Sequence, residues 1–378
     1  MDFNTKVGVL GGGQLGKMLA LAAADWHIPI YALDKSQNFP AGVAIRHFVE
    51  GDFKNYDDVY QFGQQVDVIT VEIEHVNTAA LKALVAEGKT VHPSPDKLSI
   101  IQDKGLQKQF YAEKQLPTST FELFEDADAI QAAIDSGKLH YPFVQKTRTA
   151  GYDGQGVAVI RSEKDALLQA PSVIEPLVDI RKELAVIVGR NASGDVNAFP
   201  VVEMAFHPTA NLVEYLLCPA QIPAKIAEQA TNIAKQTIEA YDICGILAVE
   251  FFWTASDTIL INEVAPRPHN SGHHTIESCY TTQYEQHLRG VLNLPLGSTK
   301  LKTGAVMANL LGHPDYQGNV RYKGLSEALS MEGVKIHLYG KKQTKPFRKM
   351  GHITVLNDDL DAAISTAKAV KEQLKVVA

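Results

Sequence analysis

The sequence predicts an N-terminal α/β domain with a doubly wound parallel sheet, followed by a larger α+β domain and a small β-rich C-terminal domain. Strand and helix patterns alternate over the first hundred residues, runs of strand patterns with few helices follow from residue 118, and the last eighty residues hold short apolar segments. Alternation is typical of parallel sheets covered by helices, whereas runs of strands are typical of antiparallel sheets. A chain of 378 residues also has room for two or three domains of about 150 residues each.

The first domain is expected to span residues 1–96. Its elements are short apolar or amphipathic segments separated by turns. HPSPDK at 92–97 is rich in proline and marks the end of the domain. The expected strands are 6–10, 28–34, 66–72 and 89–93, and the expected helices are 14–24 and 77–87.

The second domain is expected to span residues 97–297 and to begin with one helix over roughly 97–114, which Pro117 ends. TASD at 254–257 has the composition of a turn, so the apolar segments on either side of it should form an antiparallel hairpin. The expected strands are 141–147, 156–161, 172–178, 182–190, 199–206, 246–253 and 258–264, and the expected helices are 163–169 and 223–241.

The third domain is expected to span residues 298–378. Three segments in it have strand character: AVMANLLG at 305–312, KIHLYGK at 335–341 and MGHITVL at 350–356. A terminal helix should begin at about residue 359.

Composition and charge narrow the class of protein. The chain has 36 Lys and Arg against 43 Asp and Glu, a net charge of −7. This balance argues against broad binding to nucleic acid or anionic membranes, but it allows a local basic pocket for a phosphorylated small molecule. No apolar run reaches the roughly 18 residues of a membrane span, and the N-terminal stretch lacks the pattern of a secretory signal. Cys218, Cys244 and Cys279 show no metal spacing. We therefore expect a cytoplasmic protein without disulfides or structural zinc.

Three glycines follow the first expected strand. Gly11, Gly13 and Gly16 form a G-x-G-x-x-G pattern at the start of a helix, and Asp34 ends the next strand. In dinucleotide-binding folds such glycines admit the pyrophosphate and such an acid binds the ribose, so the pattern alone suggests NAD. A phosphorylated substrate would suit the same helix N-terminus. A tight turn with close helix–strand packing is the third interpretation, and the pattern does not decide among them.

A second glycine-rich segment, QKTRTAGYDGQGV at 145–157, lies between two expected strands. Lys146 ends the first strand, and Gly151, Gly154 and Gly156 follow it. Backbone N–H groups of such a loop can close over triphosphate oxygens while the lysine supplies positive charge. A glycine-bent hairpin is the alternative.

The expected hairpin at 246–264 carries two carboxylates. With a four-residue connection, Glu250 should face Ile261, and Glu263 should be its diagonal neighbour on the same face at about 7–8 Å. Two carboxylates on an otherwise apolar face are costly unless they meet a cation. Mg²⁺ that bridges ATP phosphates needs one or two carboxylates, and Asn262 adjoins them as a further ligand. A simple glutamate–lysine ion pair is the alternative.

APRPHNSGHH at 265–274 has three histidines within six residues. The prolines and glycine of this loop break the helix that would align His269 with His273, which disfavours zinc. A proline-braced loop that presents Arg267, His269 and Asn270 suits an anionic substrate, because arginine binds phosphate or carboxylate with two hydrogen bonds.

EPLV at 175–178, followed by Glu183, matches an adenine-and-ribose clamp. A strand offers a backbone donor and acceptor to the adenine edge, and a carboxylate accepts hydrogen bonds from ribose hydroxyls. The motif is common in strands and carries little weight by itself.

In this order, the lysine, the second glycine loop, EPLV and the carboxylate hairpin resemble the ATP-grasp superfamily. Further segments narrow the resemblance to the family of 5-(carboxyamino)imidazole ribonucleotide synthases, ATP-dependent carboxylases of purine biosynthesis, and the matches run from about residue 7 to 352. The segments are GGGQLGKM (11–18), TVEIEHV (70–76), QDK (102–104), KTRTAGYDGQG (146–156), NEVAPRPHNSGHHT (262–275), LYGK (338–341) and RKMGH (348–352).

The resemblance implies that 5-aminoimidazole ribonucleotide, bicarbonate and ATP give N5-carboxyaminoimidazole ribonucleotide, ADP and phosphate, with Mg²⁺ as the metal and a homodimer as the assembly. Catalytic roles fall to Arg267, His269, Asn270 and Asp153, and metal binding to Glu250 and Glu263. The implied ATP-binding residues are Lys104, Lys146, Gly151, Tyr152, Asp153, Gly154, Gln155, Gly156, Val157, Glu175, Pro176, Leu177, Val178, Glu183, His207, Asn262 and Glu263. The implied ribonucleotide-binding residues are Gln14, Leu15, Glu72, Lys341 and Arg348.

Two positions depart from the pattern of the family, and three alternatives stay open. Lys104 stands where relatives often carry arginine, and Gln155 stands where a basic residue is common. Lys341 and Arg348 should meet across a hairpin and bind the 5′-phosphate, with a solvated basic turn as the alternative. Another ATP-grasp ligase is the alternative enzyme, such as a formate-using glycinamide ribonucleotide transformylase or a biotin carboxylase. An NAD-dependent oxidoreductase would leave the carboxylate hairpin without a role.

Overall fold

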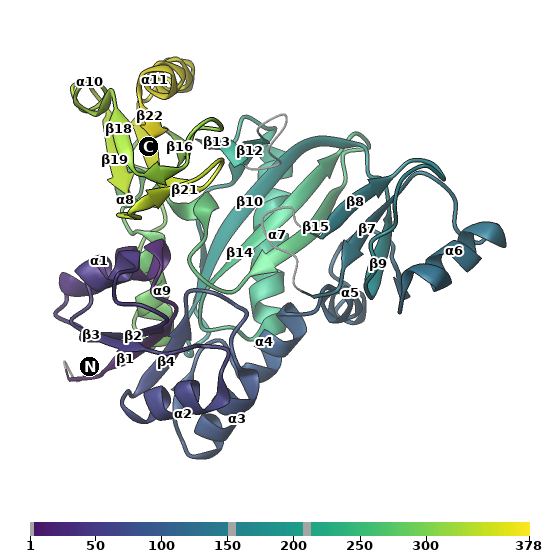
Figure 1. The fold of residues 1–378 in the computed structure, drawn as a ribbon, viewed down its shortest axis with the longest axis horizontal. Helices are drawn as coiled ribbons and strands as arrows, with labels where there is room; N and C mark the ends of the chain where they lie inside the picture. The colour runs from purple at the N-terminus through teal and green to yellow at the C-terminus, as the bar shows by residue number, and fades with distance from the viewer. Residues whose placement is uncertain (1–3, 150–155, 207–212) are drawn as a thin grey trace.

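The computed structural model describes residues 4–149, 156–206 and 213–378. In these ranges the chain forms a five-stranded parallel sheet, a four-stranded antiparallel sheet and a nine-stranded sheet, together with two small two-stranded ribbons (Figure 1). The mixed α/β and α+β prediction is confirmed.

The N-terminal sheet is parallel, as the alternating pattern predicts. Its elements are β1 (Val7–Leu10), α1 (Gln14–Ala24), β2 (Ile30–Asp34), η1 (Pro40–Val43), β3 (His47–Glu50), α2 (Tyr56–Gln64), β4 (Val68–Val71), α3 (Thr78–Ala86) and β5 (Thr90–Val91). The strand order is β3-β2-β1-β4-β5. Strands β1 and β4 are buried along their whole length, because helices cover both faces of the sheet. The sequence analysis did not identify β3 and α2.

The single helix expected over 97–114 is wrong, because the chain forms two helices there. They are α4 (Pro95–Ile101) and α5 (Lys104–Glu113). Asp103 separates them: its carboxylate accepts hydrogen bonds from the backbone N–H groups of Gly105 and Leu106, at 2.7 and 3.2 Å. A side-chain cap of this kind starts a new helix, and it places Lys104 at the N-terminus of α5.

The four-stranded sheet has the order β6-β9-β7-β8. Its elements are β6 (Glu122–Phe124), α6 (Ala127–Asp135), β7 (Phe143–Thr147), β8 (Val157–Ile160) and β9 (Ser172–Pro176). The helix expected at 163–169 is absent: Asp165 accepts hydrogen bonds from the backbone of Arg161 and Ser162, and Gln145 bonds both backbone groups of Leu168. These side-chain bonds replace the backbone bonds of a helix. Helix α6, which Asp126 caps, was not identified from the sequence.

The central sheet runs β15-β14-β10-β12-β13-β16-β21-β19, with β11 added beside β10. The middle of the chain forms β10 (Ile180–Arg190), β11 (Val196–Ala198), β12 (Val202–Phe206), β13 (Val213–Cys218), α7 (Ala224–Tyr241), β14 (Gly245–Thr254), β15 (Ile259–Ala265), η2 (Asn270–Gly272), α8 (Thr275–Ser278) and α9 (Gln283–Val291). The rest of the chain forms β16 (Ala305–Leu311), β17 (Gly318–Asn319), β18 (Arg321–Lys323), α10 (Leu325–Leu329), β19 (Val334–Leu338), β20 (Gln343–Thr344), β21 (Lys349–Leu356), α11 (Leu360–Gln373) and β22 (Lys375–Val377).

The C-terminal segment is rich in strands, as expected, but its three main strands continue the central sheet. Strand β16 pairs with β13, so β16, β21 and β19 extend the same sheet past its middle. Helix α7 packs on the other half of that sheet through Ile226, Ala230, Ala234 and Ile238, which are spaced by four residues and buried. One sheet therefore joins the centre of the molecule to its C-terminal part.

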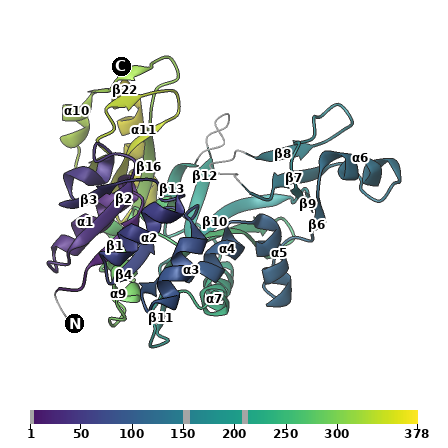
Figure 2. The same cartoon turned by 60° about the horizontal axis from the view of Figure 1, so that its bottom comes forward.

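The N-terminal and C-terminal parts lie beside each other at one end of the molecule, and β7, β8, β9 and α6 project at the other end (Figures 1 and 2). Tyr339, which follows β19, packs in the same buried cluster as α1 and α9. No helix in the described part of the chain is long and apolar enough to cross a membrane.

Candidate active site

A cavity of about 670 Å³ lies where the three larger sheets meet. The end of β4, strands β7 and β9, and strands β10, β14 and β15 form its walls. It gathers most residues that were proposed from the sequence: Gln14, Leu15, Glu72, Lys104, Lys146, Val157, Glu175, Pro176, Leu177, Val178, Glu183, Glu250, Asn262, Glu263, Arg267, His269 and Asn270. Segments that are far apart in the sequence thus share one enclosed space.

Two lysines meet one buried glutamate on the β7–β9 wall. Lys146 Nζ lies 2.8 Å from Glu175 Oε2, and Lys108 forms an ion pair with Glu175 Oε1. Burial raises the pKa of Glu175, but the two lysines lower it by more, so the carboxylate stays ionised. The Glu175 side chain therefore anchors the two lysines. Lys108 was missed, although it follows Lys104 by four residues and so lies on the same face of α5.

A β-bulge changes the predicted register of the carboxylate hairpin. Glu250 pairs directly with Glu263, and Phe251 pairs with Ile261, so Asn262 is the extra residue of β15. The diagonal arrangement expected from a regular hairpin is therefore wrong. A bulge redirects the side chain of the extra residue, and Asn262 Oδ1 accepts a hydrogen bond from Lys146 Nζ at 2.9 Å.

The pKa values of the two paired carboxylates are shifted in opposite directions. Burial raises the pKa of Glu250, and the charges of Glu263 and Glu183 raise it further. Burial also raises the pKa of Glu263, but Lys104, whose Nζ lies 3.0 Å from Glu263 Oε2, lowers it by more. Without another cation the pair holds one proton, mainly on Glu250. A divalent cation would allow both carboxylates to ionise, so these residues fit a magnesium site.

Glu183 lies on β10 beside the carboxylate pair. Burial raises its pKa to about 7, against the opposing effect of Lys146. A carboxyl group in this state can either donate or accept a hydrogen bond near neutral pH.

The loop after β15 presents Arg267 and His269 to the cavity. The Arg267 guanidinium binds both carboxylate oxygens of Glu74 through Nε and Nη2. His269 Nε2 lies 3.5 Å from Glu250 Oε1, and its Nδ1 lies 2.9 Å from Ser271 Oγ. Burial and the charges of Arg267 and Lys349 lower the pKa of His269 to about 3, so the ring is neutral.

No group of three or more His, Cys, Asp and Glu residues in the described ranges could hold a metal ion. The histidine-rich loop therefore gives no geometric support to the zinc alternative.

The first glycine loop binds a carboxylate of its own chain. Gly13 N–H and Leu15 N–H donate to Glu72, at 2.6 and 3.2 Å, and Gly12 N–H donates to Asp34 at 2.7 Å. A Cβ atom on Gly11 would lie 2.7 Å from Glu72 Oε2. These glycines make room for Glu72, and the anion at this helix N-terminus is Glu72 itself rather than a pyrophosphate. The geometry therefore removes the basis of the NAD interpretation.

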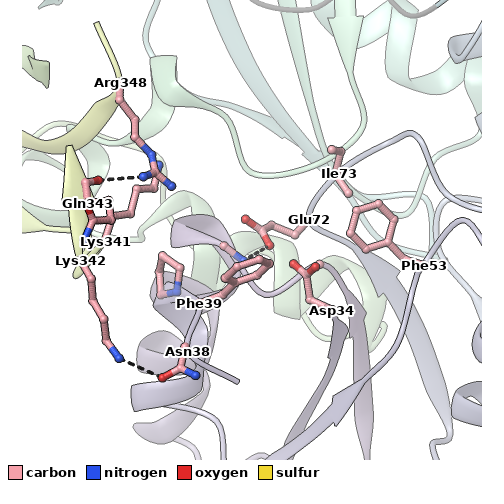
Figure 3. A pocket seen from close by; sticks show the side chains of 13 residues that line it. Asp34, Asn38, Phe39, Phe53, Glu72, Ile73, Lys341, Lys342, Gln343 and Arg348 are labelled. Carbon is pink, nitrogen blue, oxygen red and sulfur yellow. Dashed lines mark hydrogen bonds between the residues drawn. The ribbon is translucent and has the colours of Figure 1, made fainter. Parts of the chain in front are cut away.

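A smaller cavity of about 450 Å³ shares Glu72 and Ile73 with the first. Figure 3 shows Lys341, Arg348 and their neighbours on one side of it and Glu72 with Asp34 on the other. Strands β19 and β21 are antiparallel neighbours, so the hairpin brings Lys341 and Arg348 together as predicted. Arg348 Nη1 donates to the Gln343 carbonyl at 2.7 Å, and the Arg348 side chain lines the cavity.

A few proposed residues do not line either cavity. Gly156 has a φ of +75°, and its carbonyl accepts a hydrogen bond from Thr147 N–H at 2.8 Å, so its role is to close the turn between β7 and β8. The remaining ones lie outside the described residues: Gly151, Tyr152, Asp153, Gly154, Gln155 and His207.

Other cavity residues were not identified from the sequence. Glu74, His75 and Lys349 line the main cavity with Lys108. Glu74 and His75 lie within the TVEIEHV segment, two and three residues after Glu72, and that position is the signal that could have revealed them.

Models of three domain families match the chain in sequence order. The ribonucleotide synthetase preATP-grasp domain matches residues 4–102, the ATP-grasp domain matches residues 109–284, and the phosphoribosylaminoimidazole carboxylase C-terminal domain matches residues 305–366. The ATP-grasp resemblance inferred from the motifs is confirmed.

Two curated relatives differ in length. The N5-carboxyaminoimidazole ribonucleotide synthase of Synechococcus elongatus is 36% identical over 375 residues, which cover 97% of this chain and 92% of the relative. The phosphoribosylaminoimidazole carboxylase of Candida glabrata is 38% identical over 372 residues, which cover 94% of this chain and 64% of the relative. The chain thus spans less than two thirds of that longer protein.

Solved structures agree with the first relative. N5-carboxyaminoimidazole ribonucleotide synthetase from Thermotoga maritima is 41% identical with a TM-score of 0.91, and the match covers 99% of each chain. N5-carboxyaminoimidazole synthase from Aspergillus clavatus in complex with ADP and 5-aminoimidazole ribonucleotide is 33% identical with a TM-score of 0.89, covering 98% of this chain and 99% of the other. The chain therefore belongs to the family of N5-carboxyaminoimidazole ribonucleotide synthases, which are ATP-dependent ligases with an ATP-grasp domain.

Proposed function

We propose that the chain carboxylates 5-aminoimidazole ribonucleotide in purine biosynthesis, using ATP and bicarbonate and releasing ADP and phosphate. The observation that carries the proposal is the junction of the two cavities at Glu72. The larger cavity has the lysines and carboxylates suited to ATP, and the smaller one has the Lys341–Arg348 hairpin suited to a 5′-phosphate. The Aspergillus relative, whose structure contains ADP and 5-aminoimidazole ribonucleotide, supports the same pair of ligands.

The ATP phosphates would lie against Lys104 and Lys146, with the adenine against the backbone of Glu175–Val178. Lys104 and Lys146 are held in place by Glu263, Glu175 and Asn262, so their ammonium groups are positioned before the nucleotide arrives. Phosphoryl transfer asks the protein mainly for such positioning and neutralisation of charge. Glu183 would accept hydrogen bonds from the ribose hydroxyls.

Mg²⁺ would be held by Glu250 and Glu263 with Asn262 beside them, and it would neutralise charge on the ATP phosphates. The raised pKa of Glu250 supports this assignment, because a buried carboxyl that resists ionisation beside Glu263 would gain from a nearby cation. Lys104 supplies one charge to Glu263 and would remain beside the phosphates when both carboxylates are ionised.

The ribonucleotide would lie between Glu72 and the C-terminal hairpin. Lys341 and Arg348 would bind the 5′-phosphate, and Gln14 and Leu15, at the start of α1, would face the sugar with Glu72. Burial raises the pKa of Glu72, against the hydrogen bonds from the glycine loop. Glu72 at the junction of the cavities would therefore orient the ribose or the exocyclic amine toward the ATP site.

The reaction would proceed in two transfers. A bicarbonate oxygen attacks the γ-phosphorus, the bond to the β–γ bridging oxygen breaks, and ADP and carboxyphosphate form. The exocyclic amine then attacks the carboxyl carbon, gives up a proton, and inorganic phosphate leaves. Arg267, His269 and Asn270 would hold the bicarbonate-derived group, with His269 neutral and able to accept or donate one hydrogen bond.

Several assignments remain predictions of the family resemblance. They are the contact of Asp153 with the imidazole, ATP binding by His207 and by Gly151, Tyr152, Gly154 and Gln155 of the second glycine loop, a cytoplasmic location and a homodimer. Analytical ultracentrifugation tests the last of these, and a monomer at micromolar concentration would contradict it.

Release of ADP tests the function directly. We expect full turnover only when 5-aminoimidazole ribonucleotide, bicarbonate and Mg·ATP are all present. Turnover driven by formate and glycinamide ribonucleotide would indicate the alternative ligase, and stoichiometric consumption of NADH would indicate the oxidoreductase.

A further inference from the structure

Three histidine rings form a stacked column between the catalytic loop and the C-terminal hairpin. The ring centroids of His273 and His352 are 4.6 Å apart, and those of His352 and His337 are 4.5 Å apart, with interplanar angles of 26° and 11°. His273 comes three residues after Asn270, whereas His337 and His352 lie opposite each other on β19 and β21. The column therefore connects two segments that bear different parts of the proposed site.

Hydrogen bonds fix each ring of this column. Tyr284 Oη lies 3.0 Å from His273 Nδ1, and Tyr339 Oη lies 3.0 Å from His352 Nδ1. At the far end, His337 Nε2 lies 2.6 Å from Glu277 Oε1. His273 and Tyr339 line the main cavity, so the column reaches the site itself.

One glutamine ties the column to the catalytic loop. Gln283 Nε2 donates to the carbonyl of His269 at 2.8 Å and lies 3.2 Å from His273 Nδ1. Gln283 Oε1 accepts the backbone N–H of His269 at 2.9 Å. A displacement of the column would thus be passed to the loop that presents His269.

The middle ring of the column, His352, contacts the hairpin that carries Lys341 and Arg348 through Tyr339. Tyr339 lies two residues before Lys341, and the Lys341 ammonium lies 5.5 Å from the centre of the Tyr339 ring. Lys341 Nζ also donates to the Lys349 carbonyl on β21 at 2.8 Å. The Tyr339 ring, which is hydrogen-bonded to His352, therefore helps to position the Lys341 ammonium.

Burial keeps two rings of the column, His273 and His352, uncharged. His273 and His352 are 2% and 0% exposed. Burial lowers the pKa values of both rings, and the neighbouring histidines lower them further. These two neutral rings can stack closely without repulsion, so His352 acts here as a fixed spacer and not as a proton donor to the reaction.

We propose that His352 is a positioning residue that holds the Lys341–Arg348 hairpin in register with the His269 loop, so that the ribonucleotide's phosphate and its amine reach one site together. This inference rests on the proposed function. According to this inference, the fully buried His352 ring, which lies outside both cavities, controls the affinity for the ribonucleotide but not the affinity for ATP.

Two substitutions separate the two contacts of the ring. His352→Phe keeps an aromatic ring in the stack but loses the hydrogen bond to Tyr339, whereas His352→Asn keeps a polar group near Nδ1 but loses the stack. Thr354→Val is the matched control, because Thr354 is equally buried two residues along the same strand and its Oγ1 is unbonded within the described structure. Thermal denaturation establishes that each variant folds.

For His352→Phe we expect the KM for 5-aminoimidazole ribonucleotide to rise about tenfold, the size expected from loss of one buried hydrogen bond. The KM for ATP should change less than about twofold, and His352→Asn should recover part of the loss. Thr354→Val should resemble the parent. An equal rise in both KM values, or no rise in either, would overturn the inference.

A second variant covers the case in which substitutions of His352 do not fold. Glu277→Gln alters the end of the column that is least buried, where it weakens the contact with His337 without removing a ring. It should also raise the KM for the ribonucleotide selectively, and an unchanged KM would count against the column. Failure of the parent to release ADP in a ribonucleotide-dependent way would instead refute the proposed function, so the two failures are distinguishable.

Discussion

The Arg267–Glu74 ion pair offers a sharp test of how the loop after β15 is held in place. The two side chains are each 18% exposed, and Arg267 binds both oxygens of the carboxylate. Burial raises the pKa of Glu74, but the charge and hydrogen bonds of Arg267 lower it by more, from an ordinary 4.5 to about 2. At about 1.4 kcal/mol for each pKa unit, the folded protein favours the ionised carboxylate by about 3 kcal/mol.

The direction in which stability changes with pH follows from the lowered pKa of Glu74. The stabilisation is complete above pH 4.5, where the unfolded carboxyl is ionised, and it is lost as the pH falls toward 2. We therefore expect Glu74→Gln to lower the free energy of unfolding by about 3 kcal/mol at pH 7.5, and by the same amount throughout pH 6–8. The kcat/KM for bicarbonate should fall as well, because Arg267 loses the partner that orients it.

Urea denaturation followed by tryptophan fluorescence measures this loss. The control is Glu122→Gln, which breaks a 2.8 Å ion pair with Lys138 between side chains that are 47% and 66% exposed. An exposed pair contributes at most about 1 kcal/mol, so the control should remain close to the parent. A loss in Glu74→Gln no larger than in the control would refute the reasoning.

Three further predictions concern the metal, the phosphate and the pH dependence of stability. Glu263→Gln should reduce turnover by at least about 100-fold, because it removes charge from the phosphate site. Undiminished release of ADP at low Mg²⁺ would contradict this prediction. Recovery of activity by Zn²⁺ alone would favour the histidine loop as a metal site. Arg348→Ala should weaken ribonucleotide binding by about 1.5–3 kcal/mol, the range for a charged hydrogen bond, while ATP affinity stays constant. Calorimetric titrations that show equal losses of affinity for ATP and for the ribonucleotide would exclude the hairpin as the phosphate site. Burial lowers the pKa of His287 to about 3. The free energy of unfolding should therefore fall as the pH drops below about 6.5, because the unfolded ring binds a proton there and the folded ring does not. His287→Gln should make that decline shallower, and an unchanged slope between pH 7 and 5 would disprove the assignment.

The local sequence pattern determined much of the fold. Buried runs such as VITV predicted parallel strands, and the TASD turn predicted the β14–β15 hairpin. The local pattern gave wrong predictions of helices where side chains compete with the backbone for hydrogen bonds. Asp103 divides one expected helix into two, and Asp165 removes another, because each carboxylate binds backbone N–H groups in place of a helical carbonyl.

The sequence also predicted which residues line the site, because motif order and spacing are local properties. The motifs predicted both carboxylates of the β14–β15 hairpin and two cations of the C-terminal turn, Lys341 and Arg348, and all of these residues line the cavities. The sequence misjudged the register of Glu250, because the bulge at Asn262 depends on a hydrogen bond to Lys146, which lies 116 positions away.

Only the tertiary structure decided which charges meet. Arg267 and Glu74 are 193 positions apart, and Lys104 and Glu263 are 159 positions apart. The glycine loop, which by pattern suggested a pyrophosphate, binds the carboxylate of Glu72. Periodicity records which face of an element is buried, but the partner of a charged side chain depends on how distant elements pack. For this reason the sequence predicted many residues of the candidate site, whereas the packing of three sheets determined the ion pairs that they form.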